Sequence, residues 1–317
     1  RPSTSQVGLF GILEGSVTSL GLVEVDVVGS DNAGALAGSA ANGEISDCFS
    51  SGKVSSAVVS GGLIGSNQDI LTGCYSTADV SANLDEVGGL VGYNDASAIV
   101  RFCHAAGNIS GKGKVGGLIG ENYGALGACY AAGKIEATGD AVGGIVGLLQ
   151  GTMYDCSCNA EVEGDERVGG LVGHNEFGVI SRCHSSGVVS GNEVVGGLVG
   201  YSQWAIATSY SSAAVSGNRT VGGLVGANAD KISRCFSSGN VITAGQEIGG
   251  LLGANMNYGV IADCYSTSQV TGARLVGGLI GYEYGGTVTN CYGVGRVTAT
   301  VELAGGLVGA GFPKKTT

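Results

Sequence analysis

Cysteine is the most reactive residue type in this sequence, because its thiolate can attack carbon, ligate a metal or form a disulfide. The chain of 317 residues holds ten cysteines. In stacked repeats, neighbouring side chains in register point the same way rather than toward each other, so we expect buried free thiols. Nine cysteines share one position of a repeat of about 27 residues, with Ser209 in their place in one unit: Cys48, Cys74, Cys103, Cys129, Cys156, Cys183, Cys235, Cys264 and Cys291.

The sequence lacks the other motifs that would indicate chemistry. Cys156 and Cys158 form a Cys-x-Cys, but zinc needs about four ligands and no nearby Cys-x-x-Cys or histidine supplies the rest. His104, His174 and His184 form no His-Glu-x-x-His, and no Gly-x-Ser-x-Gly occurs. The recurring Gly-x-x-x-x-Gly lacks the Lys-Ser/Thr of a phosphate loop. We therefore predict no catalytic residue, no metal site and no cofactor.

Acidic residues gather in two neighbouring repeats. Glu136 and Glu163 share a column in the repeat alignment, and calcium could relieve their repulsion. The spacing matches neither an EF-hand loop nor the Gly-Gly-x-Gly-x-Asp nonapeptide. We interpret the group as a solvated acidic patch, with calcium binding as the alternative. Its members are Glu136, Asp140, Asp155, Glu161, Glu163, Asp165 and Glu166.

An aromatic residue or histidine usually follows the repeated cysteine. If the cysteines face inward, these rings face outward and form a stripe along one side of the molecule. Such a stripe could stack sugars or dock a protein, and the alternative is that the rings only stabilise one another. The residues predicted to bind are Tyr75, His104, Tyr130, His184, Tyr210, Phe236, Tyr265 and Tyr292; Phe49 and Ser157 occupy the same column.

The elements that must position these columns are set by one motif, Val-Gly-Gly-Leu-Val-Gly, and its variants. The copies recur every 26 to 28 residues, and so regular a period indicates one structural unit stacked end to end. Their first residues are Val7, Ala33, Ser60, Val87, Val115, Val142, Val168, Val195, Val221, Ile248, Val276 and Ala304.

The repeat predicts an all-β protein. The 62 glycines and the lack of a 3.6-residue period exclude helix, while polar-apolar alternation indicates two or three short strands per unit. We predict a single-domain parallel β-solenoid of about 11 turns with essentially no α-helix and, at ~4.8 Å per turn, a length of roughly 50 Å. It spans residues 1–310, with a variant first turn at 1–32 and a tail leaving the repeat at 311–317. The cysteine and the residues two, four and six places after it share parity and should point inward together.

Two further columns lie at the motif. An asparagine often follows it by two places, and we expect these amides to stack as a structural ladder. The leucine of the motif has the opposite parity to its two valines. Either the glycines bend the strand and bury both, which we favour because glycine permits backbone angles that Leu and Val do not, or the leucines form an exposed apolar stripe that binds a partner.

The composition of the chain limits the kinds of partner that it can bind. The formal net charge is −11 and only 13% of residues are charged, so there is no basic footprint for nucleic acid. The sequence contains no apolar run of about 18 residues, so we predict no membrane insertion. The first residues do not resemble a secretion leader, and both ends look like cut edges of a longer protein.

The unit at residues 168–175, followed by Ile-Ser-Arg-Cys-His-Ser-Ser-Gly at 180–187, closely resembles the GLUG motif family. The resemblance extends over nearly the whole chain. In that family the repeats occur in large secreted or surface-attached bacterial proteins, including adhesins and some immunoglobulin A peptidases. The resemblance therefore implies an extracellular location. The zinc motif of the peptidases is missing, so their activity is not implied here.

We accordingly expect a non-enzymatic extracellular module, a stiff stalk or adhesive rod of a larger bacterial surface protein. Its partners would be other regions of that protein, a glycan or a host or cell-surface protein, with self-association as a further option. Two alternatives remain at this stage. One is a polysaccharide-acting β-helix enzyme or accessory carbohydrate-binding region, and the other is an ice-binding face, for which no regular threonine array exists.

Overall fold

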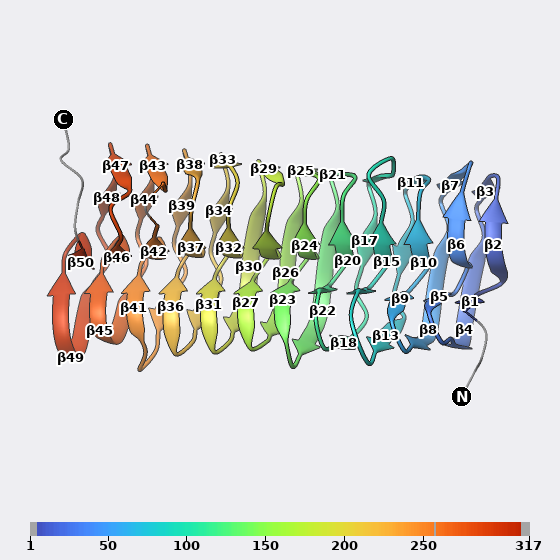
Figure 1. Cartoon of the computed structure of the whole chain (residues 1–317), viewed down its shortest axis with the longest axis horizontal. Helices are drawn as coiled ribbons and strands as arrows, with labels where there is room; N and C mark the ends of the chain where they lie inside the picture. The colour runs from blue at the N-terminus through green and yellow to red at the C-terminus, as the bar shows by residue number, and fades with distance from the viewer. Residues whose placement is uncertain (1–4, 257, 312–317) are drawn as a thin grey trace.

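The protein is a parallel β-solenoid. The computed structural model describes residues 5–256 and 258–311, and within these residues only strands, bends and turns occur, with no helix. Successive turns lie side by side along the long axis, and the first and last described turns lie at opposite ends of the rod (Figure 1). Among the described residues, no helix is long and apolar enough to cross a bilayer. The predicted all-β solenoid of about 11 turns is confirmed.

The strand that follows the glycine pair builds one sheet of twelve strands, each contributed by a successive turn. Its strands run unbroken from the first turn to the last. They are β2 (Phe10–Glu14), β6 (Ala37–Ala41), β10 (Ile64–Asn67), β15 (Val91–Asn94), β20 (Ile119–Asn122), β24 (Val146–Leu149), β28 (Val172–Asn175), β32 (Val199–Ser202), β37 (Val225–Asn228), β42 (Leu252–Asn255), β46 (Ile280–Glu283) and β50 (Val308–Gly311).

The strand that leads to the cysteine builds a second sheet of eleven strands. These strands are β3 (Val17–Thr18), β7 (Glu44–Ser46), β11 (Ile70–Thr72), β16 (Ile99–Arg101), β21 (Ala125–Gly127), β25 (Thr152–Tyr154), β29 (Val179–Ser181), β33 (Ile206–Ala207), β38 (Lys231–Ser233), β43 (Val260–Ala262) and β47 (Thr287–Thr289).

The remaining strands, which run from the cysteine to the next glycine pair, join in one sheet of 27 strands. They are β1 (Gln6–Val7), β4 (Gly21–Val28), β5 (Asn32–Gly34), β8 (Phe49–Ser56), β9 (Val59–Gly61), β12 (Tyr75–Ser76), β13 (Asp79–Ala82), β14 (Val87–Gly88), β17 (His104–Ala105), β18 (Ile109–Gly111), β19 (Val115–Gly116), β22 (Tyr130–Ala137), β23 (Asp140–Gly143), β26 (Ser157–Glu163), β27 (Glu166–Gly169), β30 (His184–Ser190), β31 (Glu193–Gly196), β34 (Tyr210–Ser211), β35 (Ala214–Ser216), β36 (Arg219–Gly222), β39 (Phe236–Ser237), β40 (Val241–Ile242), β41 (Gln246–Gly249), β44 (Tyr265–Ser266), β45 (Val270–Gly277), β48 (Tyr292–Gly293) and β49 (Val297–Gly305).

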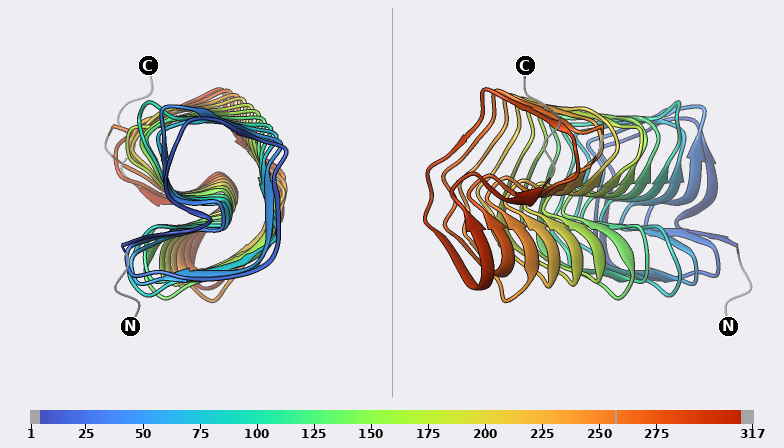
Figure 2. Two further views of the ribbon diagram at one scale, coloured as in Figure 1. Left: turned by 90° about the vertical axis from the view of Figure 1, so that its right-hand side faces the viewer. Right: turned by 60° about the vertical axis from the view of Figure 1, so that its left-hand side comes forward.

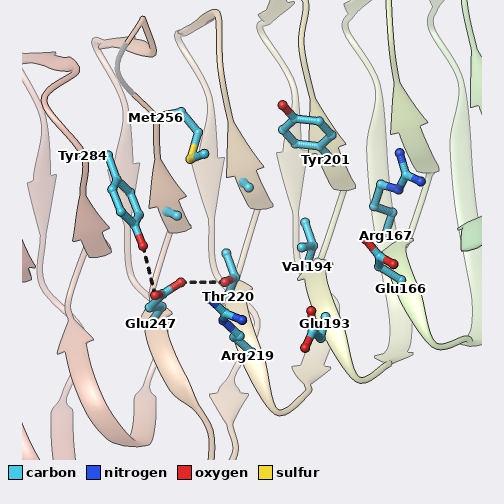
Figure 3. A pocket seen from close by; sticks show the side chains of 12 residues that line it. Glu166, Arg167, Glu193, Val194, Tyr201, Arg219, Thr220, Glu247, Met256 and Tyr284 are labelled. Carbon is cyan, nitrogen blue, oxygen red and sulfur yellow. Dashed lines mark hydrogen bonds between the residues drawn. The ribbon is translucent and has the colours of Figure 1, made fainter.

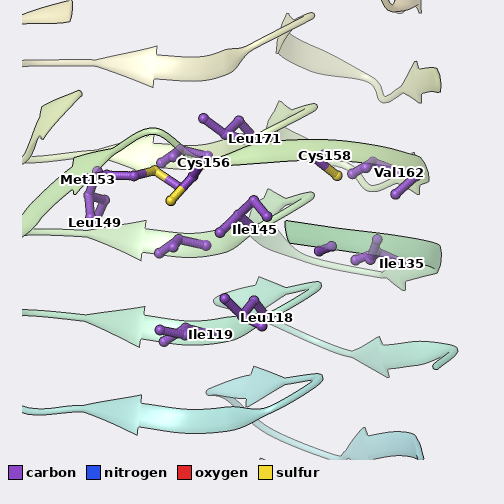
Figure 4. Close-up of a cluster of buried hydrophobic side chains, with 14 of the residues drawn as sticks. Leu118, Ile119, Ile135, Ile145, Leu149, Met153, Cys156, Cys158, Val162 and Leu171 are labelled. Atoms are coloured by element: carbon purple, nitrogen blue, oxygen red, sulfur yellow. The ribbon is translucent and has the colours of Figure 1, made fainter. Parts of the chain in front are cut away.

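The inward columns are as predicted. Cys74, Ser76, Ala78 and Val80 are all buried, and the same spacing repeats in the other turns. Leucine, isoleucine, valine and cysteine side chains from neighbouring turns pack together inside the coil (Figure 4). Because every strand pairs with its equivalent one turn away, each core position is surrounded by like residues, and this is the packing that makes the repeat so regular.

The thiols are buried, as predicted, and all ten are free. Nine lie in the core, and Cys291 is partly exposed. Burial raises the pKa of Cys158 to about 12, so this thiol stays protonated at neutral pH. Ser209 fits the cysteine column because its hydroxyl accepts the Cys183 N–H at 3.1 Å and donates to the Ala207 carbonyl at 2.8 Å.

The chain bends at the glycine pair and buries both valine and leucine. Leu90, Leu118, Leu171, Leu198 and Leu224 are fully buried, so the alternative of an exposed leucine stripe is wrong. The favoured bend is confirmed, but its reason differs from the expected one. A Cβ on Gly88 would overlap the Val91 carbonyl, and one on Gly89 the Gly117 carbonyl. Close approach of backbone to backbone, rather than a left-handed angle at the pair, disfavours larger residues there, and Ala35 in the second turn is the exception at the second position.

The left-handed angles fall on the residue before the motif instead. Glu86 has φ 46°, Lys114 40°, Arg167 51° and Val194 54°. A second set of left-handed residues stands directly before the cysteines, for example Asp47 and Arg182. These two corners turn the chain between its sheets, and non-glycine residues occupy them at a steric cost.

The asparagine ladder is confirmed. The Asn67 amide donates to Asn94 at 2.8 Å, and Asn94 donates to Asn122 at 2.7 Å, all three fully buried. Leu149 interrupts the ladder, and Glu283 continues it by accepting from Asn255 at 2.9 Å. Where two asparagines are neighbours, one amide donates to the next, and Asn122 beside Leu149 donates to the Gly124 carbonyl instead, so that a costly unpaired amide is avoided.

The two ends of the predicted domain differ from its middle. In the first turn Leu9 is exposed, whereas Leu36 and Leu63 at the same position of the next two turns are fully buried. Residues 1–4 of the predicted variant turn lie outside the described residues. Gly311, predicted to begin the tail, is the last residue of β50 and pairs with Glu283, while residues 312–317 lie outside the described residues.

Candidate functional site

The predicted aromatic stripe is a set of stacked rings. Tyr75 lies between Phe49 and His104, with ring centroids 4.9 and 4.8 Å away and planes within 4° of parallel. A second stack runs through His184, Tyr210, Phe236, Tyr265 and Tyr292, with centroids 4.8 to 5.2 Å apart.

Ser157 separates Tyr130 from the second stack. Within each stack a ring covers the faces of its neighbours, and most of these rings are half-buried. The stacking therefore supplies the mutual stabilisation that was the alternative to ligand binding. That the eight residues also bind a ligand remains a prediction.

The acidic patch contains ion pairs. Glu136 and Glu163 are direct neighbours in register, as the alignment predicts. Lys134 pairs with Glu136, Asp140 with Arg167, and Arg182 forms a two-pronged pair with Asp155 at 2.7 and 2.8 Å. In the part of the chain that the structure describes, no three His, Cys, Asp or Glu side chains group so as to hold a metal ion.

A groove that the sequence did not predict lies over the glycine bends. Each turn is indented on one side (Figure 2). Side chains face each other there from two columns: the residue directly before the motif and the residue directly after its last glycine. We call the surface lined by these two columns the groove. Its composition changes along the rod.

In the first half of the groove, charged groups pair across the indentation. Lys114 Nζ lies 2.6 Å from Glu121 Oε2 and 3.5 Å from Glu86 Oε1. The Tyr123 hydroxyl donates to Glu121 Oε1 at 2.9 Å. We call Glu86, Lys114, Glu121 and Tyr123 the Lys114 cluster.

Burial and crowding of carboxylates shift the protonation of this cluster. Burial, followed by the hydrogen bond to Glu121, raises the pKa of Glu86 to about 7. Burial also raises the pKa of Tyr123 to about 12, with the hydrogen bond to Glu121 adding to the effect. The two carboxyl groups thus share one cation, and near neutral pH Glu86 is poised to hold a proton.

The middle of the groove centres on His174. Arg167, whose Nε donates to Asp140 at 2.6 Å, also contacts His174 Nδ1 at 3.1 Å. His174 Nε2 lies 3.1 Å from Gln203 Oε1, and its ring stacks on Tyr201 with centroids 5.4 Å apart. Burial lowers the pKa of His174, which favours a neutral imidazole.

In the second half the groove opens into a pocket of about 440 Å³. Tyr284 lies toward one end, Arg167 lies at the other end beyond Tyr201, and Arg219 and Glu193 line the opposite side (Figure 3). In register, Ala227 and Ala254 follow Tyr201 in the next two turns. The volume of the pocket falls within the range of ligand pockets, roughly 300–1,000 Å³.

Glu247 is a buried charged group of this pocket, with 8% of its surface exposed. Thr220 Oγ1 donates to its Oε2 at 2.6 Å, and the Tyr284 hydroxyl donates to its Oε1 at 3.1 Å (Figure 3). Burial and the neighbouring Glu247 carboxylate raise the pKa of Tyr284, so it remains a proton donor. The two hydroxyls fix the carboxylate in one orientation.

The family model of the GLUG motif matches residues 29–55, 164–190, 217–242 and 244–271. Each matched segment contains the glycine motif, the cysteine, and the valine six places after it. The chain carries GLUG motif repeats. The resemblance seen in the sequence is thereby confirmed at four positions. No curated protein and no solved structure matches the chain.

The groove of these GLUG repeats escaped prediction because the two columns flanking the motif vary in residue type. The residues before the motif include Glu, Lys, Arg, Val, Thr, Ala and Leu, and those after it include Tyr, Glu, Leu, His, Ala and Ser. Alternation along a strand tells whether a side chain faces out, but not whether the outer surface is concave there. One signal was present: two alanines, Ala227 and Ala254, lie between tyrosines in a single column.

Proposed function

We propose that these GLUG repeats form a non-enzymatic extracellular module, a stiff rod in a larger bacterial surface or secreted protein. The observation that carries the proposal is the sheet from β2 to β50, in which twelve successive strands pair in register without a break. Bending such a rod would strain backbone hydrogen bonds, the asparagine ladder and the ring stacks together. A repeat protein with this continuity suits the task of holding other parts of a protein apart.

An adhesive contribution fits the same rod. The predicted stripe, from Tyr75 to Tyr292, runs along one side and repeats aromatic and histidine rings at turn spacing, with Ser157 interrupting it once. A repeated array offers many weak contacts to a glycan or a host or cell-surface protein, and many weak contacts together give strong attachment. Other regions of the same protein and further copies of the chain are the remaining partners.

The proposal is tested in the natural protein carrying an epitope tag next to the first turn. Deleting residues 115–194 removes three turns and joins Lys114 to Val195. Val195 begins a motif copy as Val115 does, so the repeat stays in register across the junction. We expect the tag to be accessible to antibody on intact cells. We also expect the purified deletion variant to shorten by about 14 Å in small-angle scattering.

A matched variant replaces the same residues with a flexible Gly/Ser linker of equal length. It should lose the rod-like scattering profile that the in-register deletion keeps. Access to the tag only after cell lysis would contradict an extracellular role. Hydrolysis of a polysaccharide or protein by the purified chain, abolished by one substitution, would contradict a non-enzymatic one.

A further inference from the structure

The pocket lies over a gap of two alanines between two rings of one column, Tyr201 and Tyr282. Tyr201 stacks on His174 with one face, and in register its other neighbour is Ala227. Ala254 follows in the next turn, and Tyr282 in the turn after that. Since alanine ends at Cβ, no side chain of this column covers the second face of Tyr201. The strands that carry Tyr201 and Tyr282 lie three turns apart, about 14 Å.

The opposite wall of the gap is polar. Glu247 is held by Thr220 and Tyr284, and it lines the pocket together with Glu193 and Arg219, which are neighbours in register. The wall thus offers fixed hydrogen-bond acceptors and a guanidinium donor facing an apolar floor and a tyrosine ring (Figure 3). Arg167 at the edge of the pocket is already paired with Asp140. The pocket therefore has more carboxylates than cations left to contact a ligand.

We propose that this pocket binds a neutral oligosaccharide, with one sugar ring stacked on the free face of Tyr201 above Ala227. A sugar ring has an apolar C–H face, which suits the tyrosine and the alanine floor, and an edge of hydroxyl groups, which suits Glu247, Glu193 and Arg219. The site is distinct from the predicted stripe and does not depend on the rod role.

The same chemistry disfavours other occupants. An apolar peptide side chain would stack on Tyr201 but would leave the polar groups of the wall without partners, which is costly once water is excluded. A polyanionic glycan would meet the carboxylates of Glu166, Glu193 and Glu247. A neutral ligand that carries both donors and acceptors satisfies the two walls at once.

The experiment measures binding of neutral tetrasaccharides of glucose, mannose and galactose to the purified chain by calorimetry and ligand-observed NMR. The decisive variant is Ala227→Tyr, which fills the gap with a residue that the same column already accepts at Tyr201 and Tyr282. We expect at least one tetrasaccharide to bind at millimolar concentration or below. We expect Ala227→Tyr and Tyr201→Ala each to weaken binding by about tenfold or more.

Ser66→Tyr is the matched control, because Ser66 occupies the same column beside Tyr93 and far from the pocket. It should bind like the wild type, and thermal melts should show all variants folded. No binding of any neutral tetrasaccharide by the wild type, or equal binding by Ala227→Tyr, would overturn the proposal. Binding of only an oligogalacturonate or an aromatic peptide would overturn the assigned ligand class. None of these results bears on whether the chain is a rod.

Discussion

The two halves of the groove share one backbone and differ in their side chains. Around Lys114 the two columns contact each other through an ion-pair network. Between Tyr201 and Tyr284 the column after the motif holds only the small residues Ala227 and Ala254, and a pocket is left there. Strand pairing and register are the same in both halves. In this solenoid the fold is set by the columns that repeat, and a local site arises where one outward column changes the size of its residues.

The largest effect should come from the glycines that both halves share. A Cβ at Gly89 or Gly223 would overlap the carbonyl of the equivalent glycine one turn on, Gly117 or Gly250, whereas one at Gly306 meets nothing within 4 Å. Gly89→Ala and Gly223→Ala should each cost about 3 kcal/mol or more, and Gly306→Ala should cost well under 1. Urea denaturation followed by circular dichroism measures this. A large difference between Gly89→Ala and Gly223→Ala would show that the halves do not share one backbone requirement.

The next largest effect on stability should distinguish the two halves when one cation is removed from each. Lys114→Met leaves Glu86 and Glu121 facing each other without a counter-ion and should cost about 2 to 3 kcal/mol. Arg219→Met removes an exposed cation at the rim of the pocket and should cost less than about 0.5 kcal/mol. Denaturation midpoints of the two variants provide the comparison. Equal costs would mean that the Lys114 cluster contributes nothing specific.

The pH dependence of stability tests the Lys114 cluster directly. Burial raises the pKa of Glu86 from 4.5 to about 7, so between these values the folded state holds a proton that the unfolded chain has released. The Glu86 contribution is therefore fully present below about pH 4.5 and is lost as pH rises to about 7, with a total change of about 3 kcal/mol. Glu86→Gln should remove this part of the pH profile. Denaturation curves from pH 4 to 8 that keep the full slope in the variant would argue against the shift.

The smallest effect concerns the corner before the motif. Val194 has φ 54°, an unfavourable angle for a β-branched residue, while Asn42 occupies a left-handed position with φ 64° at lower cost. Val194→Asn should stabilise the chain by about 1 kcal/mol. The same change at Lys114 should destabilise it, because the ion pairs are lost. An unchanged or lower melting temperature for Val194→Asn would indicate that the corner is not strained.

Much of the fold follows from the sequence because its columns are nearly pure. Three positions repeat often enough to be recognised: the cysteine, the buried residue six places later and the asparagine after the motif. They reveal the length of the repeat, which side chains point inward, and the asparagine ladder. The sequence did not disclose why the glycine pair is needed. Gly88 and Gly89 are required by atoms that belong to other strands and turns, and contacts of that kind are absent from a local pattern.

The sites were harder to predict than the fold for a related reason. Lys114, Glu121 and Tyr123 look like scattered polar residues until the bend brings the two sides of the motif together. Glu247 and Tyr284 are 37 residues apart in sequence and meet only because one belongs to the next turn. These side chains come together because each turn is indented and because turns stack on one another. The stripe from Tyr75 to Tyr292 could be predicted because it lies in one regular column of the repeat.

The in-register pairing between turns also has a mechanical consequence. The hydrogen bonds between turns point along the rod, so a pull on its two ends acts along these bonds and opens them one after another, peeling off the outermost turn before the next. A folded turn contributes about 4.8 Å to the length of the rod. Its 26 to 28 residues extend to roughly 90 Å once released. Under tension the molecule would therefore lengthen in discrete steps, dissipating energy at each one while the remaining turns keep their structure.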